Sequence, residues 1–472
     1  FIQILFQFLI PVVLIRILSQ TDYGIYQKSL FVATMIIPLF RFHLTDSLFY
    51  FLPISTKDNE KNQIISQTYF QLLAICIIMS VIVLISYPFI ESFFENQEFF
   101  KYRYQILAII FFTVSSSILE NIFILEKKSK LVVIFASSDK FLRTCLLLIL
   151  VYTYQTIELA LLALIIHGLF RLIFLTVYLF KHYRLSLLLI KINNLKKQWK
   201  YIFPMGLGLF VGVFGKNADK LIVAWLLTDG DFALYTIGNM SIPLIATVYV
   251  SIGNVVMPQL AKYSINKELK KTLQLWKAMV LKNAILTLPI IFFFMIEAKE
   301  IFIILFTDAF VDSANVFRII IMILVIQMLG YGYVLRAFGK TKKILIAKLY
   351  RTSLSLFVGY FLISNFGIIG AALTFVFSYF INAVIQLNQA KKILQVCWKD
   401  YLPWIDFMRL LLISLIPSIV IYFLNTLDIN IFLKLALNSF IYFSLIFLLL
   451  KKFNYLEVFG LTKIYNQLKG IL

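Results

Sequence analysis

Three charged residues stand inside one long apolar stretch, PMGLGLFVGVFGKNADKLIVAWLL, which covers residues 204–227. They are Lys216, near its middle, and Asp219 and Lys220, at the i+3 and i+4 positions that share one face of a helix. Asp219 can neutralise one lysine, and the remaining positive charge suits a diphosphate, which a lysine meets as a point charge. The alternative is an ion pair between helices, with Lys220 reaching to the edge of the stretch.

A second apolar stretch, residues 28–53, carries Arg41 near its centre, followed by His43 and Asp46. A related stretch, 233–257, has no charge in the corresponding apolar part, so Arg41 is not required by the fold alone. Arg41 is therefore either a cation facing a cavity or the structural partner of a nearby carboxylate. His43 and Asp46 are three residues apart on one face; they could relay a proton, but a structural pair is the favoured interpretation.

Other charges in apolar stretches rank lower as substrate contacts. Asp139 and Arg143 have the i, i+4 spacing of a pair that neutralises itself, with Lys140 beside them, and His167 and Arg171 share a face. Three scattered histidines and three single cysteines predict neither a metal site nor a disulfide framework. The glycine motifs miss the spacings of nucleotide-binding loops, so we expect no cofactor.

The elements that carry these charges must be membrane helices. The chain has 472 residues, of which 61% are apolar and 14% charged, and its mean hydropathy is +0.91. A soluble globule cannot bury that much apolar surface, and the apolar runs repeatedly reach the roughly 20 residues that span a bilayer as a helix. We therefore predict an all-α, polytopic membrane protein.

The apolar windows predict fourteen spans. They cover residues 1–18, 28–53, 64–90, 104–125, 131–153, 157–180, 204–227, 233–257, 277–297, 313–335, 344–363, 367–388, 407–425 and 429–450. We interpret residues 1–18 as a truncated first span and not as a signal peptide. The basic segment 181–203 alternates apolar and basic residues, which favours a short helix on the membrane surface.

The basic residues fix an orientation. Loops after even-numbered spans, with the C-terminal tail, hold twenty-six lysines and arginines, whereas the opposite loops hold four, Lys28, Lys101, Arg103 and Lys299. Basic loops stay in the cytoplasm, so both termini are predicted there. The same rule explains the net charge of +21 without nucleic acid.

One turn is repeated. LSQTDYGIY, residues 18–26, matches LTDGDFALY, residues 227–235, in a register of 209 positions, and similar apolar runs flank each copy. Because an even number of spans separates the copies, the two halves run in the same sense, about an axis along the membrane normal. The domains predicted from this are a six-helix bundle at 1–180, a cytoplasmic linker at 181–203, a second bundle at 204–388, and two further helices with a basic tail at 389–472.

The repeated turn L-[ST]-x-x-D-[YF]-[GA]-[IL]-Y, the fourteen spans and the proline of Val256-Met257-Pro258 together resemble the polysaccharide flippases, the Wzx type, of the multidrug/oligosaccharidyl-lipid/polysaccharide exporter superfamily. The resemblance implies two pseudo-symmetric six-helix bundles around a central cavity plus two C-terminal helices. One departure is Phe42-His43-Leu44-Thr45-Asp46-Ser47, where many relatives have a glycine-rich end to the second span.

The resemblance implies that the chain moves an undecaprenyl-diphosphate-linked oligosaccharide, an O-antigen or capsule repeat unit, across a bacterial cytoplasmic membrane by alternating access. Its expected partners are that lipid, membrane lipids, a polysaccharide polymerase and other assembly proteins. The diphosphate would bind Arg41 and Lys216, with Lys220 as a helper. The alternatives are a drug or cation exporter of the same superfamily, working around Asp46 and Asp219, and a membrane polymerase or glycosyltransferase, which the short outer loops disfavour.

Overall fold

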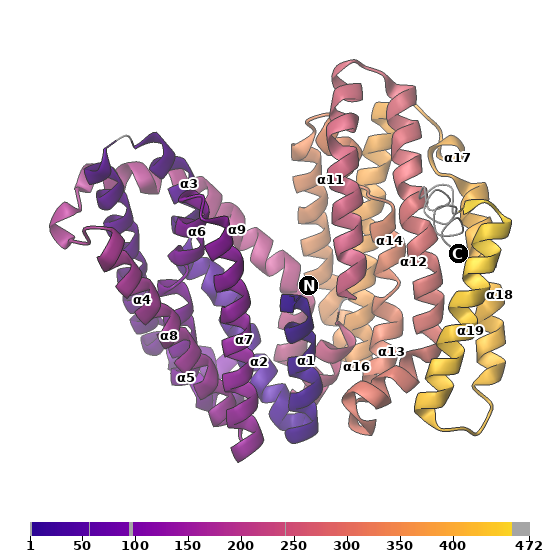
Figure 1. Ribbon diagram of the computed structural model, residues 1–472, viewed down its shortest axis with the longest axis horizontal. Coiled ribbons are helices and arrows are strands. Elements are labelled where there is room, and N and C mark those ends of the chain that lie inside the picture. The colour runs from indigo at the N-terminus through magenta and orange to yellow at the C-terminus, as the bar shows by residue number, and fades with distance from the viewer. Residues whose placement is uncertain (1, 56, 94–97, 241, 456–472) are drawn as a thin grey trace, which may run out of the picture. The chain divides into compact units, whose positions relative to one another are not determined.

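The computed structural model describes residues 2–55, 57–93, 98–240 and 242–455, and throughout these ranges the regular structure is helical (Figure 1). The end of the predicted basic tail, 456–472, lies outside the described residues. The α-helices are α1 (Ile2–Ile17), α2 (Gln20–Arg41), α3 (Leu44–Ile54), α4 (Asp58–Phe93), α5 (Arg103–Ser115), α6 (Ile118–Leu125), α7 (Ser129–Tyr154), α8 (Ile157–His182), α9 (Ile192–Leu226), α10 (Asp229–Gly238), α11 (Pro243–Ile265), α12 (Leu269–Phe306), α13 (Asp312–Ile320), α14 (Ile323–Met328), α15 (Tyr333–Ala337), α16 (Thr341–Leu394), α17 (Trp398–Tyr401), α18 (Trp404–Leu424) and α19 (Ile431–Lys452). Three short 3-10 turns are η1 (Glu98–Tyr102), η2 (Leu187–Leu189) and η3 (Asp308–Phe310).

Each of the fourteen predicted windows falls on a helix or on a run of consecutive helices, so the predicted fold class is confirmed. Within the described ranges, nine such helices or runs are both long and apolar enough to cross a membrane. Two of the predicted windows join in α16, which kinks at Gly367 (φ 55°, ψ −135°). A glycine reaches that backbone conformation without the clash that a Cβ would cause.

Large apolar side chains on the outside of these helices support the membrane assignment. Phe357 of α16 is 79% exposed and Phe440 of α19 is 76% exposed, and many other aromatic and aliphatic residues along the same helices are exposed. A water-soluble chain rarely leaves such continuous apolar faces open. Lipid tails cover them at no cost, while the helices satisfy their own backbone hydrogen bonds.

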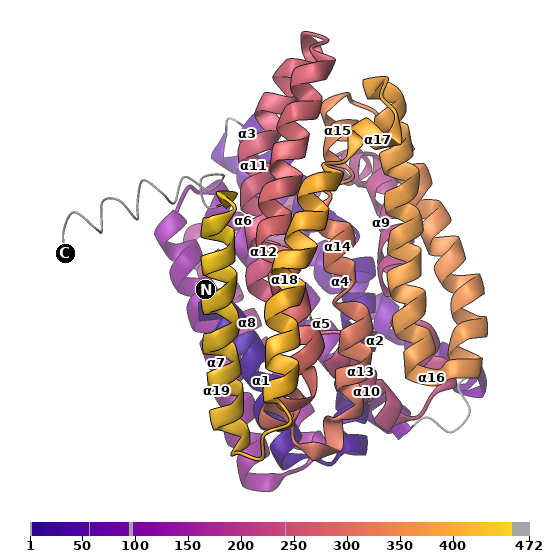
Figure 2. The same ribbon diagram turned by 90° about the vertical axis from the view of Figure 1, so that its right-hand side faces the viewer.

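Contacts divide the chain into two compact units, residues 1–233 and 234–472. In the first unit α7 packs against α1 and α8, α5 packs against α2, α4 and α8, and α9 packs against α2 and α3. In the second unit α12 is the central helix, in contact with α11, α13, α14, α18 and α19. Figure 2 shows α18 and α19 side by side along this unit.

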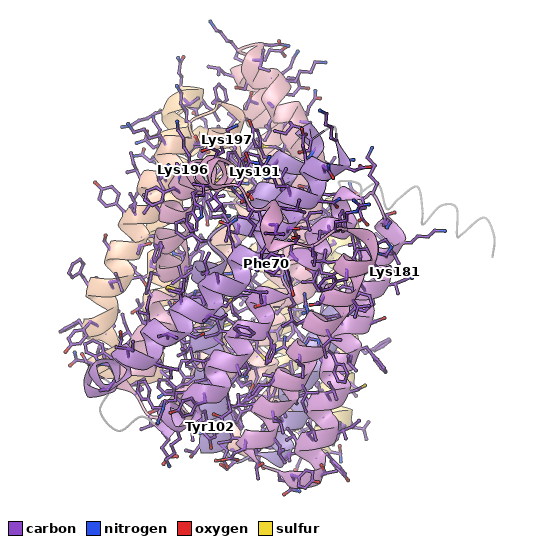
Figure 3. All side chains as sticks on the ribbon, turned by 90° about the vertical axis from the view of Figure 1, so that its left-hand side faces the viewer. Phe70, Tyr102, Lys181, Lys191, Lys196 and Lys197 are labelled. Carbon is purple, nitrogen blue, oxygen red and sulfur yellow. The ribbon has the colours of Figure 1, made fainter. Side chains whose placement is uncertain are left out.

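The segment 181–203 is not the short surface helix that the sequence predicts. After α8 the chain is extended around Tyr183 and then enters α9, which continues without a break from Ile192 to Leu226. The end of the linker and the seventh span are therefore one helix. Lys191, which directly precedes α9, and Lys196, Lys197 and Lys200 within α9 are exposed. Figure 3 shows Lys191, Lys196 and Lys197 at the end of the first unit opposite to Tyr102.

The repeated turn has the same local structure in both copies. The Ser19 hydroxyl accepts a hydrogen bond from the backbone N–H of Asp22 at 3.1 Å and donates to the Asp22 carboxylate at 2.7 Å. Thr228 and Asp231 repeat both bonds at the same two distances. Each pair caps the start of a helix, α2 or α10, so the sequence match corresponds to a real structural repeat.

The two turns also pack directly on each other within the first unit. The Lys28 ammonium lies 2.8 Å from Asp229 Oδ1 and donates to the Leu227 carbonyl at 3.2 Å, and Lys28 is only 1% exposed. Gly24 is needed there, because a Cβ would lie 1.9 Å from the Asp229 carbonyl oxygen. Counting Lys28 among the loop charges was therefore wrong: it is a buried residue of α2.

Candidate substrate-binding site

The middle of α9 presents an open stripe that ends in a positive charge. Lys216 is exposed, one helical turn beyond Gly212 and two beyond Gly208. A methyl group added at Gly208 or Gly212 would meet no atom within 4 Å, so neither glycine is a packing glycine in this structure. Gly206 is different: it packs closely, because a Cβ there would lie 2.2 Å from the Phe42 ring.

The three charges of α9 do not share one environment. Asp219 is 3% exposed, Lys220 is half-buried, and Lys216 is exposed. The Lys220 ammonium is attracted by Asp219 and repelled by Lys216, which shows that the three charges lie within electrostatic reach. Lys216 has no hydrogen-bond or ion-pair partner in the part of the chain that the structure describes. Its charge therefore remains available to a ligand.

Arg41 is the last residue of α2, at a sharp break before α3. The next two residues, Phe42 and His43, both have left-handed backbones, with φ of 42° and 56°. That conformation costs an L-residue roughly 1–2 kcal/mol. Arg41 is half-buried and, across the described ranges, has no ion-pair or hydrogen-bond partner.

His43 and Asp46 form the structural pair that we favoured: His43 Nδ1 lies 2.5 Å from Asp46 Oδ2. The carboxylate sits in the first turn of α3, where it also interacts favourably with the positive end of the helix dipole. The pair thus fixes the start of α3 just after Arg41.

Phe42 anchors the break against α9. Its ring packs against Trp199, Phe203 and Phe210, with ring centroids 5.6, 6.3 and 6.5 Å away, and against Gly206. Beside it lies a cavity of about 410 Å³ lined only by apolar and aromatic residues, namely Ile36, Leu39, Phe40, Phe42, Ile75, Ile78, Met79, Val83, Trp199 and Phe210. An apolar cavity of this size can accept an apolar ligand group.

Gln198 forms a polar connection between α9 and the helices α3 and α4 that the sequence pattern does not predict. This side chain of α9 is 2% exposed; its amide oxygen accepts from Gln67 (2.6 Å) and Gln71 (2.8 Å), and its amide nitrogen donates to Ser47 (2.7 Å) and Thr68 (3.0 Å). All of its hydrogen-bonding capacity is used within α3 and α4. In the sequence Gln198 lies among lysines, and the apolar periodicity does not distinguish it from a surface residue.

A buried charge cluster in α7 and α8 corrects one predicted pair. Asp139 contacts His167 Nε2 at 2.8 Å and Arg171 Nη1 at 3.1 Å, and Arg171 also reaches Glu120 at 3.3 Å. The predicted intrahelical pair of Asp139 with Arg143 was wrong. Asp139 faces α8 and pairs across the helix interface, and the shared face of His167 and Arg171 is confirmed by their common partner.

Glu126, just after α6, ties the start of the linker to the bundle. It accepts hydrogen bonds from Tyr178 (2.6 Å) and Tyr183, and its carboxylate lies 2.9 Å from the Lys128 ammonium. Burial alone would raise the pKa of Glu126, but the hydrogen bonds from Tyr178, Tyr183 and Lys128 outweigh it and hold the pKa below 4.5. Burial, and then the hydrogen bond to Glu126, raise the pKa of the Tyr183 hydroxyl. The group is therefore a carboxylate at neutral pH.

The family follows from the sequence of the first half of the chain. Residues 1–264 match the family model described as "Polysaccharide biosynthesis protein". The chain belongs to this family. A search of curated proteins finds no match.

Solved structures of other proteins share the fold of this chain. The chain is similar to a lipid II flippase, MurJ, in an inward closed conformation, with 17% identity, a TM-score of 0.74, and coverage of 95% of this chain and 98% of that one. It is also similar to an inward-facing multidrug resistance MATE family transporter of the MOP superfamily, with 13% identity, a TM-score of 0.63, and coverage of 83% of this chain and 94% of that one. At these identities the likeness concerns the fold: this is a multi-pass membrane protein with a transporter-like architecture.

Proposed function

We propose that this chain is a flippase that moves a lipid-linked oligosaccharide from the inner to the outer leaflet of a bacterial cytoplasmic membrane. The substrate would be an undecaprenyl-diphosphate-linked repeat unit for a surface polysaccharide such as an O-antigen or a capsule. The family, and the fold shared with a lipid II flippase, support this class of substrate. The charge bias of the loops supports a topology with both termini in the cytoplasm.

The observation that carries the proposal is the exposed Lys216, unpaired among the described residues, near the middle of a stretch that the sequence predicts to span the membrane. A lysine at mid-bilayer costs roughly 2.5–3.5 kcal/mol on insertion scales, so it should not face lipid. An open stripe of small residues leading to it, Gly208 and Gly212, suits the wall of a cavity. We propose that Lys216 faces that cavity and that Lys220 assists it.

Arg41 supports the same class of ligand. Its guanidinium is unpaired among the described residues, and the residues that precede and follow it in the chain, Phe40 and Phe42, line the apolar cavity. A guanidinium binds phosphate oxygens through two parallel hydrogen bonds, and an apolar surface next to it suits the first isoprene units of a polyprenyl chain. The rest of the chain would remain in lipid.

The pairing of Asp46 and the burial of Asp219 favour an anionic ligand over a cationic drug. Asp46 is occupied by His43, and Asp219 is 3% exposed. An exporter of organic cations would need an unpaired carboxylate open to the cavity. Here the Asp46 side chain is 36% exposed but paired with His43, whereas the exposed Lys216 is unpaired among the described residues. In our proposal Asp46 and Asp219 position the basic residues around the ligand.

The test is transport of a fluorescent undecaprenyl-diphosphate oligosaccharide across proteoliposomes that contain the purified full-length chain. Arg41→Ala and Lys216→Ala are compared with the wild type, and Lys197→Ala, which removes an exposed lysine from the same helix as Lys216, is the matched control. We expect transport to be lost in the first two variants and kept in the third, with equal amounts of folded protein in all.

Two outcomes would refute the proposal. Normal transport by both Arg41→Ala and Lys216→Ala would remove the diphosphate site, even if the flippase activity stood. Extrusion of an organic cation by the wild type, with no movement of any lipid-linked sugar and a loss in Asp46→Asn or Asp219→Asn, would make the chain a cation exporter.

A further inference from the structure

A fully buried carboxyl group in the second unit has no part in the proposed substrate site. Glu297 of α12 is 0% exposed, and its Oε1 accepts hydrogen bonds from the side-chain amides of Asn425 and Asn438, each at 3.0 Å. Asn425 directly follows α18, and Asn438 belongs to α19. The carboxyl group therefore joins the central helix of this unit to the C-terminal helix pair, whose position beside α12 is visible in Figure 2.

Two buried oxygen atoms of this cluster have no hydrogen-bond donor among the described residues: Glu297 Oε2 and Asn438 Oδ1. Both residues are 0% exposed. An ionised carboxylate with one bare oxygen in such a place loses its hydration without replacement, which is strongly unfavourable. The bare amide oxygen adds a second unmet acceptor.

The surrounding charges do not compensate an ionised Glu297. On α12 itself Glu300 adds a like charge and Lys299 is exposed. On α19 Lys434 is near enough to attract the carboxylate, but its ammonium donates to the Asn425 backbone carbonyl at 3.1 Å. From α13, Arg318 donates to the backbone carbonyls of Met295 and Ile296. Within the described ranges none of these cations forms an ion pair with Glu297.

We propose that Glu297 and Asn438 form a proton-binding site inside the membrane. A proton on Oε2 changes that oxygen from an acceptor into a donor, and Asn438 Oδ1 is the unmet acceptor of the same cluster. In this proposal a single proton satisfies both bare atoms, while Oε1 keeps its two amide donors. A hard metal cation would need about six oxygen ligands, far more than the two free ones.

The predicted topology indicates from which side of the membrane protons reach Glu297. Asn425 is the first residue of the turn between α18 and α19, at residues 425–430. This turn is on the outer side in the predicted topology, so in our proposal protons reach the site from outside. An ionisable residue within membrane helices is a common element of proton-driven transport. Because the site needs no oligosaccharide, it can be tested separately from the flippase proposal.

Infrared difference spectroscopy of the purified full-length chain in lipid vesicles, titrated with pH, tests the proposal. We expect the C=O stretching band of a protonated, buried carboxyl group at neutral pH and its loss at high pH. The band should be absent in Glu297→Gln and retained in Glu300→Gln, the matched change one turn along the same helix.

A second measurement does not depend on the spectral assignment. Glutamine has the shape of the protonated acid and can donate to Asn438, so Glu297→Gln should fold as well as the wild type. Since the folded wild type would hold an extra proton, its unfolding midpoint should fall as pH rises, and this part of the slope should vanish in Glu297→Gln. Failure of Glu297→Gln to fold, or a band and a slope identical in the two proteins, would overturn the proposal.

Discussion

Replacing Lys28 by methionine should destabilise the first unit markedly, because its ammonium is the buried half of an ion pair. Lys28 and Asp229 have side-chain exposures of 1% and 11%, and their charged atoms are 2.8 Å apart. Removing one partner of a buried pair typically costs about 3–5 kcal/mol, since the other charge stays buried and alone. The Leu227 carbonyl would also lose its donor. The upper part of the range is therefore expected for Lys28→Met.

A double-mutant cycle isolates the pair. The free energy of unfolding of the purified chain in mixed detergent micelles is measured for Lys28→Met, Asp229→Asn and the double variant. Because the double variant leaves no unpaired charge, we expect the two single costs to overlap by more than about 1 kcal/mol. The exposed pair Lys61–Asp58, at 3.2 Å, is the control, and its cycle should give less than about 1 kcal/mol.

The reasoning is refuted if the costs of Lys28→Met and Asp229→Asn simply add. Additivity would mean that the two charges do not stabilise each other and that the contact between the repeated turns rests on other groups. A loss of less than about 1 kcal/mol in Lys28→Met would refute the burial argument as well, because an exposed lysine would give the same value.

Three further results are expected. Gly24→Ala should lower the unfolding midpoint, because its Cβ would lie 1.9 Å from the Asp229 carbonyl oxygen. Gly208→Ala, with open space around it, should raise the midpoint, because alanine is favoured over glycine in a helix by about 1 kcal/mol. Equal shifts of the midpoint in the two variants would contradict this reasoning. Gln198→Leu should cost several kcal/mol in chemical denaturation, at about 1–3 kcal/mol for each buried partner left unpaired, and a cost near zero would show that the partners find water. The pKa of Glu126 is lowered in the folded chain, so its contribution to stability is complete above pH 4.5 and is lost as pH falls below that value. Glu126→Gln should therefore weaken the fall of the thermal unfolding midpoint at acid pH. The same fall in the wild type and in the variant would exclude the effect.

The sequence identified the helices and the repeat because both depend on local patterns. Apolar windows of about twenty residues must become helices in lipid, whatever surrounds them. The two capped turns likewise depend on a hydroxyl and a carboxylate three residues apart, Ser19 with Asp22 and Thr228 with Asp231. The roles of Arg41 and Lys216 in transport stay a prediction, to be tested as described above.

The partners of the buried polar groups were decided only by the tertiary structure. Asp139 could pair along its own helix or across to α8, and helix rotation selected His167 and Arg171. Lys28 looked like a loop charge until packing enclosed it, and Gln198 looked like a surface residue among lysines. Glu297 stood near the end of an apolar window, and the bare oxygen of its carboxyl group exists only because α18 and α19 close over it. A periodic pattern gives the face of a helix, but which neighbour meets that face depends on packing between residues far apart in the chain.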